Sequence, residues 1–142
     1  HPSDSEVTVY DMKCVYGNLD AYINIKSAVV GGKRQKDDIS KADGLKAFYA
    51  DDINKQFFVA TFFIQFNANM SIEITKAIVF PIAWIPDIYV NPSNNGNLQS
   101  AYYKDLGDAV KRTNNQFIPL LHDAIQIAEK KKQENSLRIL DL

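Results

Sequence analysis

Strict alternation of apolar and polar residues runs through Ile64-Gln65-Phe66-Asn67-Ala68-Asn69-Met70-Ser71-Ile72-Glu73-Ile74-Thr75. The same phase extends back through Phe58 and Phe62. Successive strand residues point to opposite faces of a sheet, so the pattern predicts a strand with one buried and one solvent-facing side. An unbroken strand over residues 58–74 would span roughly 55 Å at ~3.3 Å per residue. We therefore expect one long strand over residues 57–75, with another long element against its apolar face.

A helical period follows, from Leu98 to about Lys132. The apolar residues that recur there at three- and four-residue spacing are Tyr102, Leu106, Ala109, Val110, Phe117, Leu121, Ala124, Ile125 and Ala128. Pro119 removes one backbone donor inside this stretch, which predicts a kink or a short break. A helix of this extent would reach about 50 Å at ~1.5 Å per residue. The matching lengths predict that the helix over residues 98–132 packs along the long strand.

The rest of the chain suggests shorter elements. Residues 6–30 predict a β-hairpin that turns at Gly17-Asn18, and residues 31–43 form a charged segment without apolar periodicity, which predicts a loop. Residues 44–53 fit either a helical turn or a strand, and we favour the strand, within a region of strands over residues 45–90. Weak alternation over residues 137–141 predicts a short final strand. The predicted fold is a single α+β domain: a strongly twisted antiparallel sheet of about five or six strands, packed on one long kinked C-terminal helix.

Composition narrows the possible functions. The chain has 142 residues, of which 46% are hydrophobic and 23% charged, as in ordinary globular domains. Sixteen basic residues against seventeen acidic ones argue against general nucleic-acid binding. The single cysteine, Cys14, excludes an intrachain disulfide and a cysteine-rich metal site, and we expect no metal or cofactor. No stretch reaches the ~18 apolar residues that a transmembrane helix requires.

Little in the sequence suggests catalysis, and two other kinds of site remain open. The adjacent carboxylates at residues 37–38 and 51–52 are typical of solvated loops or caps, so we expect no catalytic residue and no enzyme. The basic clusters Lys33, Arg34, Lys36 and Lys130, Lys131, Lys132 suit either a solvated surface or contact with anionic lipid headgroups or an acidic partner. The sequon at Asn69-Met70-Ser71 makes Asn69 a glycosylation candidate. It suggests a secreted protein, with a cytoplasmic one as the alternative.

Aromatic residues crowd the central third of the chain. Phe57, Val59 and Phe63 would lie on the opposite face of the predicted strand from Phe58 and its neighbours in phase, Phe62 and Phe66. The first half of the strand is therefore apolar on both sides. One explanation is a sheet covered on both faces inside an ordinary core. The other is an apolar surface for a partner subunit or a lipid chain.

The order of these elements resembles a known family. An alternating strand, Phe62-Phe63-Ile64-Gln65-Phe66-Asn67-Ala68-Asn69-Met70-Ser71-Ile72-Glu73-Ile74, precedes a proline-containing helix around Asn115-Gln116-Phe117-Ile118-Pro119-Leu120-Leu121 and a closing segment Leu137-Arg138-Ile139-Leu140-Asp141-Leu142. This arrangement over residues 57–142 is similar to the C-terminal part of the tubular lipid-binding (TULIP) superfamily, to which bactericidal/permeability-increasing protein belongs. The resemblance implies a curved sheet wrapped around a long helix, with apolar ligand between them. The chain is short for a complete module, and Cys14 alone cannot form the disulfide of the larger members. Some small bacterial members act through assembly with larger partners.

Two functional hypotheses follow. The first is non-enzymatic binding of a lipid or other apolar ligand between sheet and helix. Its predicted lining consists of Phe58, Phe62, Ile64, Phe66, Met70, Ile72, Tyr102, Leu106, Val110, Phe117, Leu121 and Ile125. The second is a protein–protein interaction module that assembles with itself or with a larger partner, through sheet edges or the face that carries Phe57 and Phe63. In both cases Lys130, Lys131 and Lys132 could make peripheral contact with a membrane.

Overall fold

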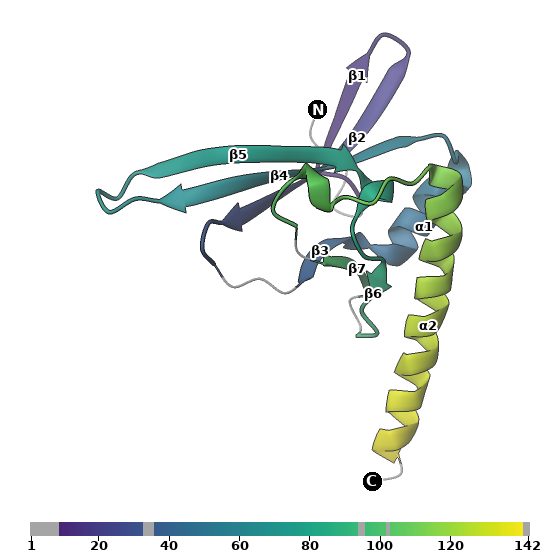
Figure 1. Cartoon of the computed structure of the whole chain (residues 1–142). Helices are drawn as coiled ribbons and strands as arrows, with labels where there is room; N and C mark the ends of the chain where they lie inside the picture. Colours follow the sequence, from purple (N-terminus) through teal and green to yellow (C-terminus); the bar gives the residue numbers. More distant parts are fainter. Residues whose placement is uncertain (1–8, 33–35, 94–95, 102, 141–142) are drawn as a thin grey trace.

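The computed structural model describes residues 9–32, 36–93, 96–101 and 103–140 (Figure 1). The chain is α+β. Its elements in order are β1 (Met12–Tyr16), β2 (Leu19–Val29), β3 (Lys36–Lys41), α1 (Ala42–Asp51), β4 (Gln56–Phe66), β5 (Ile72–Pro81), the 3-10 helix η1 (Ile82–Trp84), β6 (Tyr89–Val90), β7 (Asn97–Ala101), the 3-10 helix η2 (Leu106–Asp108) and α2 (Asn114–Leu140).

The strands form two sheets in place of the one that the sequence predicts. Sheet A has four strands in the order β1-β2-β4-β5, and sheet B has three in the order β3-β7-β6. In sheet A, β1 and β2 form an antiparallel hairpin around Gly17, β4 and β5 form a second one, and β2 pairs with β4 in parallel. A parallel pair needs a crossover connection, which β3 and α1 supply. Sheet A is therefore mixed, and only sheet B is antiparallel throughout.

The prediction of one long strand over residues 57–75 is wrong, because the chain reverses direction between β4 and β5. Residues 67–71 form the turn, in which the backbone N–H of Asn67 donates to the carbonyl of Ser71 at 2.9 Å. The side chain of Asn69 accepts from the backbone N–H and the hydroxyl of Ser71 at 3.1 and 2.6 Å. Met70 has a φ of 67°, in the left-handed region. Asn and Ser side chains favour turns through such local hydrogen bonds, and here they outweigh the alternating pattern.

The predicted C-terminal elements also differ from the structure. Within residues 98–132, the first part is strand β7 and η2, and α2 begins only at Asn114. Thr113 and Gln116 form a reciprocal cap: the backbone N–H of Gln116 donates to the Thr113 hydroxyl at 3.2 Å, and that of Thr113 donates to the Gln116 side-chain carbonyl at 2.9 Å. This capping box explains why the helix begins here. The helix continues without a break through Pro119 to Leu140, so residues 137–140 are helical and not a strand.

Two further segments adopt structures other than those predicted. Residues 44–53, for which we favoured a strand, lie mostly in α1, whose buried residues are Ala42, Leu45 and Tyr49. The predicted charged loop over residues 31–43 contains β3, which pairs with β7. Ile39 of β3 is fully buried, and a single buried residue between polar neighbours was too weak a pattern to predict a strand.

Helix α2 does not pack along the β4–β5 hairpin. Its main contacts are with α1, β6 and η1, and its C-terminal half extends beyond the rest of the domain (Figure 1). Four residues of α2 are buried: Phe117, Leu121, Ile125 and Ala128. The ring of Phe117 lies 6.2 Å from that of Tyr49 on α1, centroid to centroid. The helix therefore packs on α1, β6 and η1 and does not lie along the β4–β5 hairpin.

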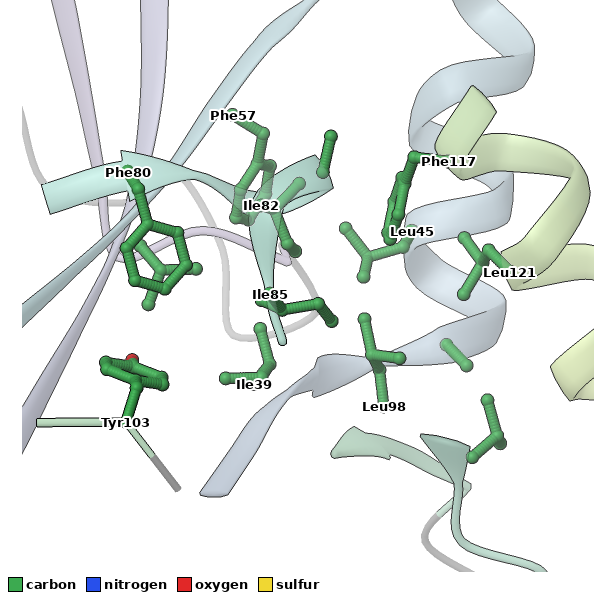
Figure 2. Close-up of a cluster of buried hydrophobic side chains, with 14 of the residues drawn as sticks. Ile39, Leu45, Phe57, Phe80, Ile82, Ile85, Leu98, Tyr103, Phe117 and Leu121 are labelled. Carbon is green, nitrogen blue, oxygen red and sulfur yellow. The ribbon is translucent and has the colours of Figure 1, made fainter. Parts of the chain in front are cut away.

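The core lies between one face of sheet A and the layer formed by α1 and sheet B. Figure 2 shows Phe57 and Phe80 of sheet A beside Ile82, Ile85 and Leu45. Phe48 of α1 makes edge-to-face contacts with Tyr22 and Phe57 of sheet A, at centroid distances of 4.9 and 5.3 Å.

Two buried polar contacts join the core-side face of sheet A to residues outside that sheet. The side-chain amide of Asn24 donates to the carbonyl of Ile39 in sheet B at 2.7 Å. The hydroxyls of Thr61 and Tyr103 are 2.6 Å apart. Asn24, Thr61 and Tyr103 are 5, 0 and 1% exposed. Buried polar groups are tolerated when they are hydrogen-bonded, so these pairs specify which face of the sheet turns inward.

Tyr49 supplies a prediction about stability. Its hydroxyl is buried and has no hydrogen-bond partner among the described residues. Burial raises the pKa of this phenol above its ordinary value, because the charged form loses its hydration. Tyr49→Phe removes an unsatisfied donor and keeps the ring, so we expect the free energy of unfolding to rise by about 1 kcal/mol. Urea denaturation of the two proteins tests this, and a loss of stability would show that the hydroxyl has a partner in solution.

Candidate interaction surface on the four-stranded sheet

The face of sheet A that turns away from the core is almost entirely apolar. Strand register places residues in rows across it: Ile25, Ala60 and Val79 form one row, followed by Ser27, Phe62 and Ala77. We call this surface the open face. It consists of Met12, Cys14, Tyr16, Leu19, Ala21, Ile23, Ile25, Ser27, Val29, Phe58, Ala60, Phe62, Ile64, Phe66, Ile72, Ile74, Ala77, Val79 and Pro81.

The side chains of the open face are exposed to a degree that is unusual for a sheet. Val29, Val79 and Ile74 are 46, 53 and 63% exposed, and Phe66 and Ile72 near the turn are 63 and 65% exposed. On the opposite face of the same strands, Phe57, Val59 and Phe63 are at most 4% exposed. Figure 1 shows no helix across the open face, and the ring contacts of Phe48 place α1 on the core side.

Polar residues occupy the core-side face where the β4–β5 hairpin extends beyond the core. Gln65 pairs with Glu73 in register there, and Lys76 lies beside Phe63 with its ammonium 4.9 Å from the ring centroid. None of the strand residues that make up the open face is charged, and the carboxylate of Asp11 lies at its edge, where it accepts a hydrogen bond from the backbone N–H of Ile25 at 2.7 Å. The apolar character of the open face is therefore continuous, and it does not end where the core ends.

The structure does not gather the predicted lining residues around one space. Phe58, Phe62 and Ile64 lie half-buried on the open face, whereas Phe117, Leu121 and Ile125 are at most 5% exposed in the core on the other side of sheet A. Met70 is 93% exposed in the turn, and Leu106 and Val110 are 54 and 42% exposed. Tyr102 lies outside the described residues.

The two faces of β4 are reversed relative to the predictions. We expected the face of Phe58 and Phe62 to lie against the helix, and the face of Phe57 and Phe63 to offer the surface for a partner. Phe57 and Phe63 are in the core cluster instead, and Phe58 and Phe62 are not. Because β4 is apolar on both faces, its periodicity could not show which face is buried. The hydrogen bond between Thr61 and Tyr103 joins two residues 42 positions apart, and no local pattern indicates it.

The other predicted sites are dispersed over the surface. Lys130, Lys131 and Lys132 lie on the exposed C-terminal half of α2. Lys33 and Arg34 lie outside the described residues, and the ammonium of Lys36 is 3.6 Å from the ring centroid of Tyr89. Asn69 is in the β4–β5 turn, where its side-chain oxygen accepts hydrogen bonds from Ser71. None of the helices in the described ranges is both long and apolar enough to cross a membrane. The described residues contain no cluster of three or more His, Cys, Asp or Glu that could hold a metal ion.

Two polar depressions flank Asn54 and Gln56, with volumes of about 290 and 270 Å³. Arg112 lines the first, and its guanidinium donates to the carbonyls of Ala83 and Ile85 at 3.1 and 2.7 Å. Partial burial lowers the pKa of Arg112. Asn114 donates to the carbonyls of Ile53 and Lys55. The side chains of Arg112 and Asn114 are therefore used in hydrogen bonds that hold segments of the chain together. Because these depressions have a structural explanation, the open face is the strongest candidate site.

Comparison with protein-family models gave no match, and comparison of the sequence with curated proteins gave none either. The site must therefore be interpreted from its own chemistry.

Proposed function

We propose that the chain is a non-enzymatic assembly module, which acts by burying the open face of sheet A against another protein surface. One observation carries this proposal: uncharged residues lie in register across neighbouring strands over the whole of the open face. Their aliphatic and aromatic side chains are 41–67% exposed at Leu19, Ile25, Val29, Phe66, Ile72, Ile74 and Val79.

The size of the surface supports this role. Strand β4 has 11 residues, and sheet A is four strands wide. At ~3.3 Å per residue and ~4.8 Å between strands, the open face covers roughly 500 Å². Monomeric proteins rarely expose contiguous apolar patches beyond about 300–600 Å², and patches of that size are often functional. Covering such a surface would be favourable by about 25 cal/mol for each Å² of apolar area removed from water.

An enclosed ligand site of the kind first predicted would need a second wall opposite these residues. The long helix would supply that wall if it lay across the open face, but α2 contacts α1, β6 and η1. A partner protein that brings its own apolar surface fits an open face without an opposite wall better than a small molecule, which prefers a concave pocket. We therefore favour assembly over solitary carriage of an apolar ligand.

Hydroxyl-radical footprinting in an extract of the natural source tests the proposed function. Radicals oxidise accessible aliphatic and aromatic side chains, and mass spectrometry locates the products. We expect Ile74 and Val79 to be oxidised several-fold less in the extract than in dilute, purified protein. Ile127 on the exposed side of α2 is 68% exposed and serves as the internal reference. Equal oxidation of the open face in both samples would contradict the proposal.

A further inference from the structure

The open face has the properties of a surface that is complementary to itself. None of its strand residues is charged, and the carboxylate of Asp11 lies at the edge beside Ile25, so two copies can approach face to face without like charges meeting across the middle of the surface. A surface for an anionic lipid headgroup or for an acidic protein would be expected to carry cations, and the described lysines of sheet A lie elsewhere. Lys13, Lys26 and Lys76 all occupy the core-side face of their strands.

The arrangement of large and small side chains on the open face also supports contact with a second copy. Phe62 lies near its middle, between Ser27 and Ala77, which are its neighbours in the row across the sheet. Ala60 precedes it along the same face of β4. The ring of Phe62 is half-buried, and the small side chains of Ser27 and Ala77 on either side of it are exposed. A copy related by a twofold axis can place its own Phe62 against these small side chains, because interdigitation of large and small side chains fills the space between packed sheets.

The area of the open face comes close to what a dimer needs, and a polar rim would supply the remainder. Two open faces in contact would bury about 1,000 Å² of apolar surface, and specific interfaces bury about 1,200–2,000 Å² in total, including a polar rim. The turn at residues 67–71, at one end of the open face, would contribute to such a rim. Sheets pack face to face about 10 Å apart, so the interface would resemble the interior of a β-sandwich.

We infer that the partner of the open face is a second copy of this chain, in a twofold dimer in which the two four-stranded sheets stack with Phe62 of each beside Ala77 of the other. This inference rests on the proposed function, and it adds the identity of the partner. The interface is isologous, so each copy contributes the same residues.

Sedimentation velocity over a range of concentrations tests the inference with the whole purified chain. We expect a reversible dimer at concentrations below about 100 μM. Ala77→Lys places a charge beside Phe62 at an exposed position, where the monomer has no need of the alanine. A buried, unpaired charge costs about 3–5 kcal/mol, so the dissociation constant should rise at least 100-fold. Gln65→Lys makes the same charge change on the opposite face of the same hairpin and should alter the constant less than about threefold. Circular dichroism and the melting temperature check that both variants fold.

The possible outcomes distinguish failure of the dimer from failure of the proposed assembly function. Wild-type protein that stays monomeric at about 200 μM would overturn the dimer, as would a dimer that is unaffected by Ala77→Lys. If the purified chain is monomeric while the open face is protected in the source extract, the second copy is excluded and the proposed function stands. Protection in neither sample contradicts both. Binding of the wild type to phosphatidylcholine vesicles, with loss of binding in Ala77→Lys, would assign the open face to a lipid surface and overturn the dimer.

Discussion

Phe63→Asp is expected to unfold the protein, whereas the same substitution at the adjacent Phe62 should leave the fold intact. The side chain of Phe63 is 4% exposed and belongs to the core cluster, while Phe62 lies half-buried on the open face. Loss of a buried phenyl ring costs about 3–5 kcal/mol, and the desolvation of a carboxylate in the core adds to this cost, although the ammonium of Lys76 lies 4.9 Å from the centroid of the ring that is replaced. Together these terms approach the whole stability of an ordinary domain, about 5–15 kcal/mol. At Phe62 the new carboxylate can reach solvent, so we expect a loss of at most about 2 kcal/mol from the monomer.

Far-UV circular dichroism and urea denaturation would distinguish the two variants. Phe63→Asp should lack a cooperative unfolding transition at 25 °C, and Phe62→Asp should keep one. Phe63→Leu is the matched control, because it retains an apolar side chain at the same position and should cost only about 1–2 kcal/mol. The reverse result, with Phe62→Asp unfolded and Phe63→Asp folded, would place the core on the face of sheet A that carries Phe58 and Phe62, where the alternating pattern predicts it.

This pair of residues also shows how far periodicity can predict the fold. The alternation at Ile64–Thr75 correctly indicated β-structure with one apolar face at residues 64–66 and 72–74, and it was wrong for residues 67–71, which form the turn. Most of that stretch lies in the part of the hairpin that extends beyond the core, where the apolar face is exposed and the polar face lies on the core side. The phase of the pattern was therefore no guide to which face of β4 is buried. Contacts distant in sequence determine that face, and Asn24 with Ile39 is one of them.

Local signals for the turn and the helix start were present, but stronger patterns outweighed them in the sequence analysis. Asn67 begins a complete reversal of the chain, and the register shift between β4 and β5 falls between Phe63 and Ile64. Thr113 and Gln116 have the spacing of a capping box, which marks a helix start after the residues where the apolar period begins. The α+β class follows from the sequence because both periods are present. The division into two sheets does not, since it depends on the pairing of β3 with β7.

The sequence predicts that the candidate site is an apolar surface, but it does not predict which face of β4 carries that surface. The sequence shows that β4 is apolar on both faces, which allows an apolar surface for a partner. Only the placement of α1 on the side of Phe57 shows that Phe62 lies on the free face. The buried residues of the predicted lining that lie on α2, which are Phe117, Leu121 and Ile125, therefore stabilise the core and do not line the open face. Phe117 is the residue whose substitution tests this most directly.

Phe117→Ala is expected to lower the free energy of unfolding by about 3–5 kcal/mol, because a fully buried aromatic side chain is replaced by a cavity. Phe117 lies in the first turn of α2 and contacts Tyr49 of α1. Urea denaturation gives the free energy of unfolding. Leu120→Ala is the matched control: Leu120 lies on the same helix, is 44% exposed, and should cost less than about 1 kcal/mol. Similar losses in both variants would contradict the packing of α2 on α1.

Amide hydrogen exchange in Phe117→Ala would show which elements lose stability. The helix has 27 residues, and its buried side chains all lie between Phe117 and Ala128. An isolated helix of ordinary sequence is marginal in water, so α2 depends on these contacts. Weakening them should raise the exchange rates of amides throughout α2 more than those of β2 and β4. Because α2 and the open face lie on opposite sides of sheet A, Phe117→Ala should leave the dimer dissociation constant of the folded protein unchanged, while Ala77→Lys raises it without changing exchange in α2.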